Sequence, residues 1–155
     1  MQPFLESDMV WRLVIAAVLG VVLGFERSLA GKHAGMRTYA LVSMGSALFT
    51  IAGLLASLEL NMFVGVNPLQ IASSVVIGIG FIGSGLAVFR GEHPVELTTA
   101  TGIWLAAGVG IAVGFGFFGI AIAASILGVI IFSLLAKVER AMRVRYGSKY
   151  QETNG

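Results

Sequence analysis

Long apolar blocks alternate with short polar segments along this chain. The last block, Leu97 to Ala136, is a run of 40 uncharged residues. As one helix it would be about 60 Å long, twice the thickness of the hydrocarbon core. It must therefore fold back, and Gly114-Phe115-Gly116 is the best place because glycine permits turn geometry. The pattern predicts five membrane-spanning helices, over 9–25, 38–58, 68–89, 97–113 and 117–136.

Composition supports the same class of protein. Of 155 residues, 57% are hydrophobic and 12% are charged, whereas a soluble domain carries about a quarter charged residues. This excludes a soluble globular protein, and the apolar content excludes a disordered one. We therefore expect an all-α polytopic membrane helix bundle, with a transmembrane domain over 1–146 and a tail over 147–155.

The cations lie almost entirely on one side of the predicted bundle. Arg12 is the single cation on the other side. Cytoplasmic loops carry an excess of Lys and Arg, so the N-terminus is predicted outside and the C-terminus in the cytoplasm. The basic charge then follows from topology and does not indicate nucleic-acid binding. The nine cations on the predicted inner side are Arg27, Lys32, Arg37, Arg90, Lys137, Arg140, Arg143, Arg145 and Lys149.

Short connections bring polar side chains into one layer at the predicted cytoplasmic surface. Adjacent residues of a helix point in different directions, so we expect Glu26 to pair across helices with Arg37 or Arg90 and not with Arg27. Ordinary snorkelling of Arg37 and Arg90 to lipid phosphates is the alternative. Threonines at a helix start cap free N–H groups or form part of a polar site. The predicted cluster comprises Glu26, Arg27, Arg37, Arg90, Glu96, Thr98 and Thr99.

Glycine is abundant in the third span. Gly78, Gly80, Gly83 and Gly85 match a dinucleotide-binding pattern, but the strand and the acidic residue that this pattern requires are absent. Small residues spaced by four let helix backbones approach closely, within one bundle or across a homodimer, and we favour the dimer. A broken helix that exposes backbone to a substrate is the other use of such glycines.

Candidate chemistry within the spans is sparse. No ionisable side chain lies at the centre of a predicted span, whereas ion-coupled transporters generally place one there. Gln70 near the outer end of the third span is expected at the membrane interface. No serine lies in a nucleophile pattern, and two separate histidines do not make a metal site. We expect no enzymatic activity, no cofactor and no bound metal.

Four motifs together resemble the bacterial MgtC/SapB family of inner-membrane proteins. They are Gly24-Phe25-Glu26-Arg27, Gly35-Met36-Arg37-Thr38, the glycine run from Gly78 to Gly85, and Leu97-Thr98-Thr99-Ala100-Thr101 followed by Trp104. The resemblance implies a polytopic protein of the bacterial inner membrane, linked to adaptation to low Mg²⁺. Some members are described as Mg²⁺ transport proteins, and virulence-type members act on other membrane proteins, including ATP synthase. The family's characteristic positions here would be Glu26, Arg27, Arg37, Gln70, Gly80, Gly83, Thr98, Thr99 and Trp104.

The chain departs from the family in two respects. Val95-Glu96 stands where many members have Arg-Gly before the Leu-Thr-Thr motif, which changes the charge of the predicted cluster. The chain also ends 19 residues after Ala136, whereas virulence-type members continue into a soluble domain. We therefore expect a short form that consists of the membrane domain.

Three functions fit these observations. The first is a small regulatory or accessory protein, dimeric in the lipid bilayer, that acts through helix-face contacts with other membrane proteins. The second is a small transporter or channel for an ion such as Mg²⁺ or for a small solute, with the third-span glycines, Thr98 and Thr99 lining the path. The third is a lipid-binding protein. The lack of charge at the membrane centre favours the first.

Overall fold

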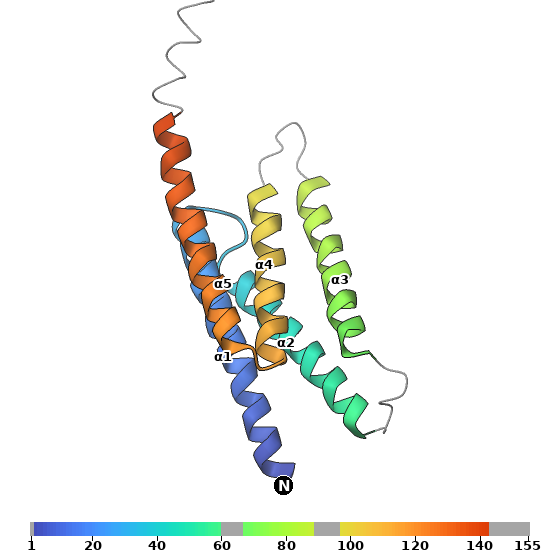
Figure 1. Ribbon diagram of the computed structural model, residues 1–155. Helices are drawn as coiled ribbons and strands as arrows, with labels where there is room; N and C mark the ends of the chain where they lie inside the picture. Colours follow the sequence, from blue (N-terminus) through green and yellow to red (C-terminus); the bar gives the residue numbers. More distant parts are fainter. Residues whose placement is uncertain (1, 60–66, 89–96, 143–155) are drawn as a thin grey trace, which may run out of the picture.

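The computed structural model describes residues 2–59, 67–88 and 97–142 and is helical outside short turns (Figure 1). Over these residues the predicted all-α fold with five helices is confirmed. The last helix continues through a π-helical stretch, η1, to Met142. The elements are α1 (Gln2–Leu29), α2 (Met36–Glu59), α3 (Pro68–Val88), α4 (Leu97–Gly114), α5 (Phe118–Ile130) and η1 (Ile131–Leu135).

Helix length and composition make this a multi-pass membrane protein. Within the described residues, four segments are long and apolar enough to cross a bilayer: Ser7–Leu29, Met36–Leu58, Leu97–Gly114 and Phe118–Met142. The described part of α3 contributes a shorter apolar segment, Leu69–Gly85.

Helix α4 lies at the centre of the bundle and contacts α1, α2, α3 and α5. Half of its residues are buried, including Ile103, Val109 and Val113. Helix α3 lies at one edge, where it contacts α2 and α4 (Figure 1). The position of α4 therefore determines where the ends of the other helices meet.

Backbones approach closely along two seams. Between α1 and α2, a Cβ on Gly20 would lie 2.7 Å from the Cα of Ala40, and one on Gly24 would lie 2.7 Å from the Cα of Met36. Between α4 and α2, a Cβ on Gly110 would overlap the Ser43 carbonyl oxygen. Since lipid tails are as apolar as the side chains, such packing is what holds membrane helices together.

The turn between α4 and α5 depends on a glycine and on a distant arginine. Gly116 has φ +84°, a conformation that side chains with a Cβ rarely adopt. Arg12 of α1 donates a 3.0 Å hydrogen bond to the Gly114 carbonyl oxygen and pairs with Asp8 at 2.9 Å. Arg12 thus satisfies a carbonyl at the negative end of α4 and ties α1 to the turn.

A matched pair of glycine substitutions on α4 tests the close packing of α4 against α2. Gly110→Ala forces the backbones apart, so we expect it to lower the free energy of unfolding by about 1–3 kcal/mol. Gly108→Ala on the same helix meets open space, so it should leave stability unchanged or raise it by up to about 1 kcal/mol. Unfolding by SDS in mixed micelles, followed by circular dichroism, measures both. Equal effects of the two changes would contradict the seam.

Candidate functional site

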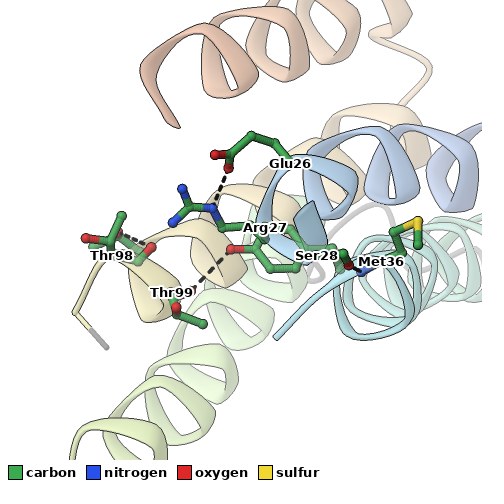
Figure 2. A network of polar contacts seen from close by, with 8 residues as sticks. Glu26, Arg27, Ser28, Met36, Thr98 and Thr99 are labelled. Atoms are coloured by element: carbon green, nitrogen blue, oxygen red, sulfur yellow. Dashed lines mark hydrogen bonds and ion pairs between the residues drawn. The ribbon is translucent and has the colours of Figure 1, made fainter. Parts of the chain in front are cut away.

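Side chains from four helical segments meet where α1 ends and where α2 and α4 begin (Figure 2). We call these residues the Arg27 cluster. The cluster comprises Glu26 and Arg27 of α1, Tyr39 of α2, Thr99 of α4 and Phe132 of η1.

Arg27 is the charged centre of the cluster and is only 3% exposed. Its Nε donates to Glu26 Oε2 at 2.7 Å, and its Cζ lies 4.2 Å from the centre of the Phe132 ring. A buried charge is tolerated when it is paired, and the face of an aromatic ring adds further attraction. The carboxylate and the ring therefore hold the guanidinium in one orientation.

The expected cross-helix pairing of Glu26 with Arg37 is wrong. Among the described residues, the ion pair of Glu26 is with its neighbour Arg27. The Arg27 side chain is long enough to bend back, so that its Nε meets the carboxylate although the two residues leave the helix in different directions. Arg37 is exposed at the start of α2. The alternative partner Arg90, like Glu96 of the predicted cluster, lies outside the described residues.

Tyr39 and Phe132 are members of the cluster that sequence reasoning missed. The buried Tyr39 hydroxyl donates to the Thr99 carbonyl oxygen at 3.5 Å. A Cβ on Gly102, one turn further along α4, would overlap the Tyr39 hydroxyl and lie 2.8 Å from Phe132 Cζ. The position of Tyr39, directly after the Arg37-Thr38 motif, is a signal that could have pointed to it. Nothing distinguishes Phe132 within its apolar block, because the π-helical stretch that positions it leaves no sequence signal.

The two predicted threonines differ in their surroundings. Thr99 is buried, and Thr98 is exposed in the first turn of α4. The Thr101 hydroxyl donates to the Thr98 carbonyl oxygen at 3.0 Å. In Figure 2 the Arg27 guanidinium is directed toward this turn. The structure therefore brings Glu26, Arg27, Thr98 and Thr99 together.

The other predicted residues lie away from the cluster. Gln70 is exposed near the start of α3, and Trp104 is exposed on α4. A Cβ on Gly83 would lie 3.6 Å from Ala100 Cβ, which is ordinary contact between α3 and α4. The other three predicted glycines of α3 are Gly78, Gly80 and Gly85. A Cβ on any of them would meet no atom within 4 Å.

A groove of about 580 Å³ runs between α2 and α3. Its polar side chains are Ser46 and Ser74. The Ser74 hydroxyl donates to the Gln70 carbonyl oxygen of its own helix at 3.0 Å, and Ser46 is buried. Leu41, Phe49 and Ile82 contribute to its apolar lining. In the part of the chain that the structure describes, no group of three or more His, Cys, Asp or Glu could hold a metal ion. The groove therefore favours an apolar occupant.

Comparison with known proteins identifies the family. The sequence profile of the MgtC family matches residues 13–141, a range that begins within α1 and includes α2, α3, α4, α5 and η1. The chain belongs to the MgtC family.

Curated relatives agree with this assignment. The chain is 36% identical to YhiD of Escherichia coli (strain K12), whose name proposes a magnesium transporter, over 97% of this chain and 72% of YhiD. It is 32% identical to Protein SapB of Bacillus subtilis (strain 168) over 74% of this chain and 51% of SapB. It is 37% identical to Protein MgtC of Salmonella typhimurium (strain LT2) over 74% of this chain and 47% of MgtC. The chain thus spans about half the length of SapB and MgtC, and no solved structure matches it.

Substitutions of two carboxylates test the Arg27 cluster. Glu26→Gln leaves a buried guanidinium without its anion, so we expect a loss of about 2 kcal/mol in the free energy of unfolding. Asp8→Asn removes the same chemistry from the pair with Arg12, where Asp8 is exposed, and should cost less than about 1 kcal/mol. The unfolding assay in mixed micelles compares them. A loss for Asp8→Asn as large as that for Glu26→Gln would count against a special role of the buried pair.

Proposed function

We propose that this protein is a small accessory or regulatory protein of the bacterial inner membrane, without enzymatic activity and with its C-terminus in the cytoplasm. It acts on other membrane proteins through the exposed face of α3, and it forms a homodimer through the same face. Family membership and the magnesium-related name of YhiD support a role in adaptation to low Mg²⁺. ATP synthase is a candidate partner, on the resemblance to virulence-type members alone.

The observation that carries this proposal is the kind of side chain that α3 exposes. Lipid is a good solvent for large aliphatic side chains, and α5 exposes Ile120, Ile122 and Ile126 to it. Helix α3 also exposes four large apolar side chains (Leu69, Ile77, Phe81 and Ile82), but between them it exposes small residues over much of its length. Small residues let a second helix backbone approach closely. The exposed small residues of α3 are Ser73, Ser74, Gly78, Gly80 and Ser84.

The groove between α2 and α3 extends this face. Gly78 belongs to both, and a Cβ there would meet open space. Large side chains of a docking helix would fill the groove, while the glycines admit its backbone. An ion path needs oxygen ligands or ionisable groups near the membrane centre. The apolar lining of the groove therefore supports helix docking over ion passage.

Magnesium transport is the second candidate function. The similarity to YhiD, 36% identical over 97% of this chain, favours it through the name of that relative. The glycines of α3 and the threonines of α4 would then line the path.

Substitutions on exposed glycines separate the two functions. Gly80→Leu should weaken homodimer formation by a factor of about five or more, equivalent to about 1 kcal/mol, because a leucine holds the second backbone away. Dilution in detergent micelles with fluorescence energy transfer between labelled protomers measures this. Gly108→Leu is the matched control, since Gly108 also lies in open space but on α4. It should leave association unchanged.

The functional readout uses the same variants. In a bacterium that lacks its own family member, the unaltered chain and Gly108→Leu should restore growth at low Mg²⁺, and Gly80→Leu should not. Liposomes that contain only this protein should show Mg²⁺ influx no faster than empty liposomes. Influx that Gly80→Leu abolishes would overturn the accessory role and establish transport.

A further inference from the structure

The Arg27 guanidinium has hydrogen-bonding capacity that the protein leaves unused. An arginine side chain carries five N–H donors, and Glu26 takes the one on Nε. Among the described residues, Nη1 and Nη2 have no acceptor. Leaving such donors unpaired on a side chain that is only 4% exposed is costly.

The two Nη atoms are nevertheless reachable from outside. Within the described residues, the one fully enclosed side-chain polar atom without a partner is Ser43 Oγ, in the interior of the bundle. Since Nη1 and Nη2 also lack partners, they must retain some accessible surface. The outer edge of a buried guanidinium is therefore open to an external acceptor.

The first turn of α4 faces this edge. Figure 2 shows the guanidinium directed toward Thr98 and Thr99. A helix start has backbone N–H groups without intrahelical acceptors and carries a partial positive charge, so it favours anions. Thr98 is exposed there and adds a hydroxyl. The unpaired donors of Arg27 and the positive end of a helix thus meet at one place.

The geometry points to a phosphate group as the ligand. We propose that the Nη edge of Arg27 and the first turn of α4 bind the oxygens of a phosphate, carried by a membrane lipid or by a soluble molecule. A planar guanidinium edge matches two oxygens of one phosphate, and backbone N–H groups at a helix start bind a third. The site lies at the ends of membrane-spanning helices, which is the level of the lipid headgroups.

Neighbouring residues hold Arg27 in this orientation. The Phe132 ring lies against the guanidinium at 4.2 Å, and the Glu26 carboxylate occupies Nε, so the Nη edge is the part left free. Arg37 at the same end of the bundle is exposed instead. The site is thus distinct from general surface charge, and it is separate from the α3 face that carries the proposed function.

Substitutions at Thr98 test the site without disturbing buried residues. Thr98→Asp places a carboxylate at the helix start beside Arg27, where it competes with phosphate and favours helix formation. Thr98→Asn has nearly the same shape without the charge. Arg27→Lys keeps the positive charge and removes the planar edge. Arg37→Gln is the control for general charge.

Two pairs of probes distinguish the sources of phosphate. The purified full chain in detergent micelles receives dioleoyl-phosphatidylglycerol or, for comparison, dioleoylglycerol, which has the same acyl chains without phosphate. Separate samples receive inorganic phosphate or chloride at equal ionic strength. The readouts are the shift in Tm and the line width of the phosphorus NMR signal. We expect Thr98→Asp and Arg27→Lys to weaken phosphate binding about tenfold or more, and Thr98→Asn and Arg37→Gln to change it less than about threefold.

Each outcome decides the proposal. Binding of phosphatidylglycerol alone, lost in Thr98→Asp, supports the site with a lipid ligand, and binding of inorganic phosphate with the same loss supports it with a soluble one. No binding of either probe by the unaltered chain overturns the proposal. An equal loss in Arg37→Gln, or no difference between Thr98→Asp and Thr98→Asn, also overturns it. If Arg27→Lys fails to fold, the pair at Thr98 still gives the answer.

Discussion

Backbone contact between α2 and α4 is the constraint on which the rest of the bundle depends. Lipid supplies no hydrophobic force between helices, so their positions follow from how closely they can pack. Gly110 admits the Ser43 carbonyl into the space of a missing side chain, and Gly114 admits the side chain of Thr50. Because α4 contacts every other helix, this seam also determines where α1, α3 and α5 lie.

The placement of α4 explains why Arg27 is buried, since this residue of α1 lies close to the first turn of α4. An arginine at the end of a membrane span ordinarily extends toward the headgroups. Arg27 is instead buried between the Glu26 carboxylate and the Phe132 ring, close to the first turn of α4. The charge is neutralised by its neighbour in sequence and shielded by a residue more than a hundred positions away. That arrangement leaves one edge of the guanidinium free, which a single surface arginine would not do.

Helix α3 differs from the rest of the bundle in having few close contacts for its small residues. Gly20 and Gly24 of α1 and Gly110 of α4 admit backbone atoms of α2, whereas Gly78 and Gly80 of α3 meet open space. The same residue type therefore serves packing inside the bundle in one place and leaves a surface open in another. The proposed contact with a second membrane protein and the proposed phosphate site thus lie on different parts of the molecule.

The sequence by itself determined the helices and the solvent around them, because apolar length and the distribution of charge can be read along one dimension. It also indicated that Glu26, Arg27, Thr98 and Thr99 lie at one end, since the connections between the helices are short. The tertiary structure alone decided which atoms meet. Glu26 pairs with Arg27 and not with Arg37 because a flexible side chain takes whichever partner the packing brings near. Phe132, which contacts Arg27, lies in a π-helical stretch of the last helix. Whether a glycine is covered depends on whether another helix packs against it, and only the tertiary structure shows this.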